Sequence, residues 1–140
     1  MRKVTLEVKL ITRNTDYAIR ALLCMAKKKG SVSAPELTND LKIPKAFLRM
    51  ILQVLSGKKI LKSQRGKGGG FMLAIKPSKV SLFSLIEIFQ GPLRLNKCSF
   101  KNAACHNIKN CGVKKKIDNI QKYVVSELRG VTLESLLNNR

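Results

Sequence analysis

The chain has 140 residues, of which 44% are hydrophobic, so it can bury a core without disulfide bonds and is not a disordered polymer. The longest uninterrupted apolar run, residues 21–26, is too short to span a membrane, and the N-terminus has no apolar block of signal-peptide length. We therefore expect a cytoplasmic protein with no membrane partner. In that reducing compartment its four cysteines favour metal, cluster or redox chemistry over structural disulfides.

The charge is strongly positive, with 28 basic and 8 acidic residues giving a net charge of +20. No acidic residue lies between Asp40 and Glu87, whereas ten Lys and Arg residues do. A long surface of one sign concentrates a polyanion such as DNA. A solvated basic face remains the alternative until the motifs are considered.

The first expected helix covers residues 14–28. Thr12 or Asn14 can cap its N-terminus, and Asp16 lies in its first turn. Its apolar positions predict a stripe that faces the core: Ile19, Leu22, Leu23 and Ala26. We interpret Cys24, which lies inside this helix, as a packing residue rather than a ligand.

Two short helices follow. Ser33 and Glu36 form a capping-box pattern that starts a helix ending near Leu41, and Pro44 starts a second helix that runs through Leu55. The residues expected to pack inward are Leu37, Leu41, Ile43, Leu48, Ile51, Leu52 and Leu55. The second helix leaves a polar end facing outward, formed by Lys45, Ala46 and Arg49. This pattern is typical of a helix-turn-helix whose second helix enters a major groove, although an ordinary pair of packed helices has the same pattern.

The next segment favours the DNA-binding interpretation. Residues 60–64 and 71–75 are expected strands, and the segment between them is basic and rich in glycine. Such a hairpin is a wing, which would place Arg65 and Lys67 against a phosphate backbone or in a minor groove. The glycines match neither GxxxxGK[ST] nor GxGxxG, the two common nucleotide-binding patterns. An ATPase or a dehydrogenase is therefore not expected.

Two further helices are expected after the wing. One covers residues 81–90, with Leu82, Leu85, Ile86 and Phe89 inward, and stops at Gly91 and Pro92. The other ends at Gly130 and carries a narrow apolar stripe formed by Val113, Ile117, Ile120, Val124 and Leu128. We interpret the stripe as a homodimer contact, with packing onto the chain's own domain as the alternative.

Between these helices, Cys98, Cys105 and Cys111 lie among polar residues, which is not typical of buried packing cysteines. Three nearby thiolates can hold an iron–sulfur cluster and leave one position for a weaker ligand. Structural zinc usually has CxxC pairs and four strong ligands, which this segment lacks, and a redox disulfide is the other alternative.

With these elements in place, the chain resembles the IscR/NsrR/CymR winged-helix regulators of bacteria. The resemblance covers nearly all of residues 9–137. It is carried by residues 10–12 and 15–22, 43–48, 63–74, the three cysteines and 131–137. It implies a homodimeric transcription factor that binds an inverted-repeat operator on double-stranded DNA and whose 4Fe–4S or 2Fe–2S cluster senses nitric oxide, redox state or iron–sulfur supply.

The fourth cluster ligand departs from one branch of this family. The iron–sulfur assembly branch has a histidine three residues after its last cysteine, where this chain has Lys114. The chain is more similar to the nitric-oxide-sensing branch, which implies that Asp16 of the partner subunit completes the site. His106 is a competing ligand, but as the direct neighbour of Cys105 it would point away from the same cluster.

Taken together, the sequence predicts a mainly α fold with a small β-hairpin wing. We expect a winged helix-turn-helix DNA-binding domain at 1–92, a cysteine-rich cluster-binding loop at 93–111, and a dimerisation helix with a C-terminal segment at 112–140. We expect the protein to be a transcriptional regulator that acts as a repressor. The alternative is a metal-dependent RNA- or DNA-binding accessory protein without a sensing role. No nucleophile–base pair stands out, so an enzyme is not expected.

Overall fold

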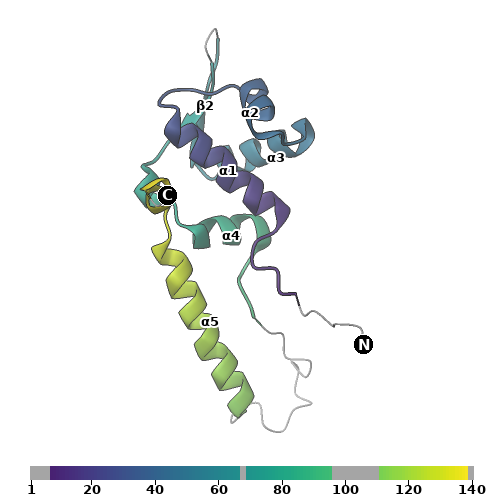
Figure 1. The fold of residues 1–140 in the computed structure, drawn as a ribbon, viewed down its shortest axis with the longest axis vertical. Coiled ribbons are helices and arrows are strands. Elements are labelled where there is room, and N and C mark those ends of the chain that lie inside the picture. The colour runs from purple at the N-terminus through teal and green to yellow at the C-terminus, as the bar shows by residue number, and fades with distance from the viewer. Residues whose placement is uncertain (1–6, 67–68, 96–110, 139–140) are drawn as a thin grey trace. The chain divides into compact units, whose positions relative to one another are not determined.

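The computed structural model describes residues 7–66, 69–95 and 111–138, which are the coloured parts of Figure 1. These residues are mainly helical, with one two-stranded antiparallel sheet, which confirms the expected fold class. The chain divides into two compact units, Met1–Ile75 and Lys76–Arg140. The expected first domain extended to residue 92, whereas the helix at 82–90 falls in the second unit.

In the first unit, helix α1 covers Arg13–Lys27, close to its expected bounds. Thr12 occupies the N-cap position, but its side chain makes no capping hydrogen bond to the helix backbone. Its Oγ1 lies 3.3 Å from Oγ1 of Thr15 instead. At the other end, Lys28 forms an ion pair with Asp40 of the second helix, and this hydrogen bond raises the pKa of Lys28.

The core-facing side of α1 differs from the expected stripe. Its buried residues are Thr15, Ala18, Ala21, Leu22 and Met25. Of the expected stripe, only Leu22 is fully buried, whereas Ile19, Leu23 and Ala26 are half-buried. The small side chains of Ala18 and Ala21 face the neighbouring elements, and α1 contacts α2, α3 and β2. The pattern of large apolar residues therefore predicted Leu22 correctly but missed the other buried positions of α1, two of which are alanines. Cys24 is half-buried as well.

The expected helix-turn-helix is present. Helix α2 covers Ala34–Leu41, and its capping box is complete: the Glu36 N–H donates to Ser33 Oγ at 3.3 Å, and the Ser33 N–H donates to Glu36 Oε2 at 3.0 Å. Lys42 ends the helix in the left-handed region at φ 57°. Helix α3 covers Lys45–Gly57 and packs on α1 and α2. Six of the seven residues expected to pack inward are fully buried, and the seventh, Leu41, is half-buried.

The expected wing is also present. Strand β1 (Leu61–Gln64) pairs antiparallel with β2 (Gly70–Leu73), with Leu61 opposite Leu73. The hairpin is not free at its base, because Val32 and Phe71 exchange two backbone hydrogen bonds of 2.8 Å. The segment before α2 therefore anchors the wing, a pairing that the sequence pattern did not predict.

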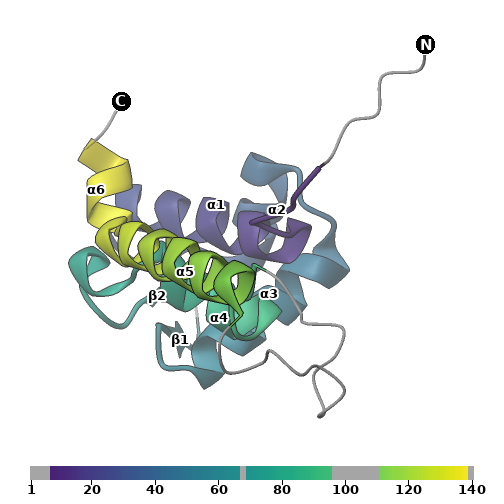
Figure 2. The same ribbon diagram turned by 90° about the horizontal axis from the view of Figure 1, so that it is seen from below.

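The second unit contains the 3₁₀ turn η1 (Pro77–Lys79), α4 (Leu82–Gln90), α5 (Gly112–Gly130) and α6 (Leu133–Asn138). Ser81 caps α4 by accepting from the Ser84 N–H at 3.1 Å, and Gly91 ends it at φ 83°. Helix α4 packs against α5, and α6 follows α5 after a short turn (Figure 2). The Leu133 N–H donates to the Val80 carbonyl at 3.0 Å, which joins α6 to the segment before α4. Within the described ranges, no helix has the length and apolar character needed to cross a membrane.

Candidate nucleic-acid interface

Helix α3 presents its expected polar end to solvent. Its buried face is formed by Leu48, Ile51, Leu52 and Leu55. Packing of that face leaves Lys45, Ala46 and Arg49 exposed, as the sequence pattern predicted. Whether these three side chains contact DNA stays a prediction, but their exposure near the N-terminal end of α3 is what a recognition helix requires.

Met50 is a further candidate on α3 that the sequence reasoning missed. Its side chain is 38% exposed, and it follows Ala46 by four residues, so the two share one side of the helix. An exposed apolar side chain in a major groove can contact a thymine methyl group. The four-residue spacing from Ala46 could have identified it.

An aromatic contact joins α3 to α1. The rings of Phe47 and Tyr17 lie 6.3 Å apart between centroids, with a tilt of 58°. Phe47 is 42% exposed and lies between the candidate DNA-contacting residues of α3. Tyr17 directly follows Asp16, so the contact connects a candidate cluster ligand with the candidate recognition helix.

A shallow hollow of about 340 Å³ lies beside the start of α3. It is lined by Ala34, Pro35, Thr38, Asn39, Lys42 and Lys45. The hydroxyl of Thr38, the amide of Asn39 and the two ammonium groups are the kinds of donor that bind phosphate oxygens in protein–DNA complexes. The α2–α3 turn therefore extends the basic face of α3 with groups suited to backbone contacts.

On the wing, Arg65 directly follows β1 and is exposed, and Lys62 on β1 is exposed as well. The other expected contact, Lys67, lies outside the described residues. The exposed Arg65 and α3 belong to one unit, and α3 contacts β1, so the base of the wing is fixed relative to α3.

Of the three candidate cluster ligands, the structure describes Cys111. It is half-buried at the N-cap of α5, where its carbonyl accepts from the Lys115 N–H at 3.1 Å and its side chain makes no capping hydrogen bond. Cys98, Cys105 and the competing His106 lie outside the described residues. Within the part of the chain that the structure describes, no three His, Cys, Asp or Glu residues are grouped to hold a metal ion.

Asp16 lies at the start of α1 in a shallow hollow of about 550 Å³ lined by residues 11–13, 16, 17 and 20. Its Oδ2 is 3.1 Å from Nε of Arg20, one turn later, and both side chains are about half exposed at 44% and 56%. An exposed pair of this kind contributes little stability. Asp16 therefore has a local partner, but one that it could leave at small cost.

Lys114 occupies the position where one branch of the family that this chain resembles has a histidine ligand. Its Nζ lies 3.0 Å from Oδ2 of Asp118, one turn further along α5. The lysine thus takes part in an ordinary helix-surface ion pair.

The expected dimer stripe of α5 is largely uncovered in the single chain. Val113 is 69% exposed and Ile120 is 51% exposed, while Ile117 and Val124 are half-buried. Only the last member of the stripe, Leu128, is fully buried, and Tyr123 beside the stripe is 68% exposed. Large apolar side chains exposed in a row are typical of a surface that a partner covers.

The sequence matches the Rrf2 family, described as an iron-dependent transcriptional regulator, over residues 11–139. A protein of Aquifex aeolicus that bears the name of an HTH-type transcriptional regulator is 28% identical over 125 residues, which cover 87% of each chain.

Two solved structures show the same fold. CymR, the global cysteine regulator of B. subtilis, has a TM-score of 0.79 at 21% identity, covering 95% of this chain and 99% of that one. IscR of T. potens has a TM-score of 0.71 at 21% identity, covering 92% and 86%. At these identities the two structures support a common fold and nothing finer.

Proposed function

Because the chain belongs to the Rrf2 family of transcriptional regulators, we propose that it is a homodimeric repressor that binds an inverted-repeat operator on duplex DNA. An iron–sulfur cluster would control this binding in response to nitric oxide, redox state or iron–sulfur supply. The protein would act in the cytoplasm. The relatives are regulators of transcription rather than enzymes.

The observation that carries the DNA-binding part is the surface of the first unit. An exposed, basic N-terminal end of α3, a hollow with phosphate-binding groups and an exposed Arg65 on the wing all lie in one unit. The base-edge contacts would come from Lys45, Ala46 and Arg49, whereas Arg65 and Lys67 would contact the backbone or a minor groove.

The residues that would hold the cluster are Cys98, Cys105 and Cys111, with Asp16 of the partner subunit as the fourth ligand. Two features of the described residues fit this role. The Cys111 side chain makes no capping hydrogen bond, and it lies at a helix N-terminus, which favours an anionic group. Asp16 is about half exposed, and so is Arg20, its partner in an ion pair. When bound, the cluster supplies an iron that reacts with small molecules such as nitric oxide.

The dimer and the sensing are connected through α1. The uncovered apolar stripe of α5 supports a second copy of the chain as its partner. If Asp16 of the partner subunit is a ligand, this bond would fix the orientation of the partner's α1, and the Tyr17–Phe47 contact would pass that constraint to α3. Release of Asp16 would then change the spacing of the two recognition helices. The cluster site and the DNA-binding surface would be the two coupled sites, and α1 would be the element that switches between two orientations.

The decisive experiment is purification without oxygen, followed by absorbance, iron and sulfide measurements and by binding to a random pool of duplex DNA. We expect a coloured protein with iron and sulfide that enriches an inverted repeat. A colourless protein with zinc would contradict the cluster, and preference for single-stranded RNA would favour an RNA-binding accessory protein instead.

The Asp16→Ala variant tests the fourth ligand. We expect it to retain a cluster with an altered spectrum and an altered response to nitric oxide. An unchanged spectrum and response would leave Asp16 as a charge that stabilises the start of α1.

A further inference from the structure

The exposed side of α3 has an apolar centre. An α-helix turns by about 100° per residue, so the direction of each side chain around α3 follows from its position in the sequence. The direction opposite to the middle of the buried face lies within about 30° of Ala46, Met50 and Gln53. All three residues are exposed. They therefore form the ridge of α3 that lies farthest from the core of the first unit.

Charged and aromatic residues lie on the two sides of this ridge. Lys45 and Arg49 are about 70–110° away on one side, and Phe47 is about 90° away on the other. The Phe47 ring contacts the ring of Tyr17 on α1, with 6.3 Å between the centroids, so that side of α3 has a neighbour. If α3 enters a groove, the positive charges can reach its edge and the phosphate groups, while the ridge points to its floor.

The part of the ridge in the first two turns of α3 has no hydrogen-bonding side chain. Ala46 is the second residue of α3, and Met50 follows it by about 6 Å along the helix axis. The Met50 side chain leans toward the helix N-terminus, and therefore toward Ala46. An apolar patch with lysine and arginine beside it fits the major groove of DNA, where the thymine methyl group is the apolar feature of the base edges.

The composition of α3 narrows the bases that it can distinguish. The helix contains no Asp or Glu, the residue types that accept a hydrogen bond from the cytosine amino group. Arg49 can donate to guanine from the side of the ridge, and Gln53 can pair with adenine two turns after Ala46. Ala46 and Met50 offer only apolar contact, which selects thymine among the four bases.

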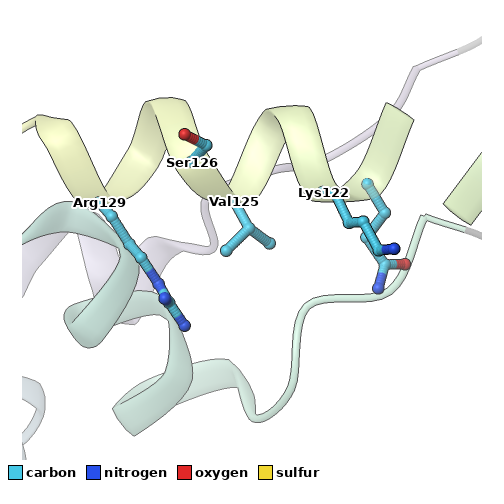
Figure 3. Close-up of a pocket in the computed structure, with 5 residues that line it drawn as sticks. Lys122, Val125, Ser126 and Arg129 are labelled. Carbon is cyan, nitrogen blue, oxygen red and sulfur yellow. The ribbon is translucent and has the colours of Figure 1, made fainter. Parts of the chain in front are cut away.

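The basic residues on α5 are placed differently. A hollow of about 350 Å³ on this helix is lined by Gln121, Lys122, Val125, Ser126 and Arg129. Figure 3 shows Lys122, Val125 and Arg129 pointing toward one side of α5. On that side the Arg129 guanidinium lies 4.7 Å from the centre of the Phe83 ring of α4. A helix face that packs against another helix cannot enter a groove, so these residues do not form a second reading surface.

We propose that Ala46 and Met50 read thymine methyl groups in the major groove and that Met50 determines part of the operator specificity. This role rests on the DNA binding proposed above and adds a specificity-determining residue to it. The distance of about 6 Å between the two residues corresponds to about two base-pair steps, so each half-site should carry thymines at this spacing. Met50 acts by excluding water from a methyl group and contributes no charge.

The probe is the duplex enriched from the random pool, with single thymines replaced by deoxyuridine. Uracil keeps the hydrogen-bonding groups of thymine and lacks only the C5 methyl group. Burial of one methyl group corresponds to about a fourfold change in affinity, so replacement of the contacted thymine in one half-site should weaken binding about fourfold. Replacement of a thymine outside the half-sites is the control and should leave the affinity unchanged.

Three variants connect this effect to Met50. Met50→Ala should bind the thymine and uracil duplexes equally at the sensitive position, whereas Met50→Leu should keep the preference because it keeps an apolar side chain. Gln53→Ala alters the same ridge one turn further along and is the matched control, which should keep the preference too. Because Met50 carries no charge, Met50→Ala should also leave the salt dependence of the affinity unchanged.

Two results would overturn this role. One is an enriched operator in which no half-site thymine can be distinguished from uracil, and the other is a Met50→Ala protein that keeps the full preference for thymine. An unaltered protein that enriches no duplex sequence would instead refute the proposed DNA binding, and that result is known before any base is replaced.

Discussion

Replacing Gly70 by alanine should destabilise the winged unit, because the first residue of β2 lies against the backbone of the segment before α2. A Cβ atom on Gly70 would lie 2.5 Å from the Val32 carbonyl oxygen, 2.7 Å from its carbonyl carbon and 2.9 Å from the Ser33 nitrogen. All three are backbone atoms, which cannot rotate away as the end of a flexible side chain can. Relief of the clash requires the two segments to separate by about 1 Å to reach ordinary van der Waals contact.

The cost follows from what that separation breaks. Val32 and Phe71 exchange two hydrogen bonds of 2.8 Å, and a shift of this size would stretch both beyond a useful length. Each contributes about 0.5–1.5 kcal/mol, so Gly70→Ala should lower the free energy of unfolding by roughly 1–3 kcal/mol. For a urea m-value of about 2 kcal/mol/M, a loss in the middle of that range lowers the midpoint by about 1 M.

The assay is urea unfolding followed by circular dichroism at one fixed protein concentration, because a dimer's apparent stability depends on concentration. Gly57→Ala is the matched control. No atom lies within 4 Å of a Cβ on Gly57, and this position at the end of α3 should be neutral or stabilised by up to about 1 kcal/mol. Equal midpoints for Gly70→Ala and the unaltered protein would refute the close approach of β2 to Val32.

Three further outcomes are expected. Arg65→Ala should weaken operator binding by roughly 1–3 kcal/mol at fixed salt if Arg65 reads a groove, and an unchanged affinity in a fluorescence titration would mean that it only faces solvent. Ser33→Ala should lower the free energy of unfolding by about 1 kcal/mol, because it removes the acceptor for the Glu36 N–H, and urea midpoints beside those of an exposed control such as Ser78→Ala would test it. Ile120→Glu should shift sedimentation toward the monomer without altering the helix content, because the 51% exposed Ile120 lies in the proposed dimer stripe; an unchanged dimer would place the interface elsewhere.

Local signals in the sequence were sufficient for the helix-turn-helix and the wing. The capping box at Ser33 and Glu36 determines where α2 begins, because it satisfies the backbone donors at that end whatever the rest of the chain does. On α3, the spacing of the large aliphatic residues leaves no doubt about the buried face, and the exposure of Lys45, Ala46 and Arg49 follows from it. The strand-forming residues on either side of the glycine-rich segment predicted the bounds of β1 and β2 to within one or two residues.

Contacts between distant segments decided the rest. The buried side of α1 contains Ala18 and Ala21, whose small size weighs little in an apolar pattern but lets neighbouring elements approach closely. The sequence pattern placed Gly70 in the glycine-rich segment between the two strands, yet only glycine fits there because the backbone of Val32, a residue 38 positions earlier, lies against it, and no local pattern reveals that proximity. The hydrogen bond from the Leu95 N–H to Oε1 of Gln121, 26 positions later, is of the same kind. Helix periodicity and caps act over a few residues, whereas which backbones meet depends on the packing of the whole unit, and only the tertiary structure determines that.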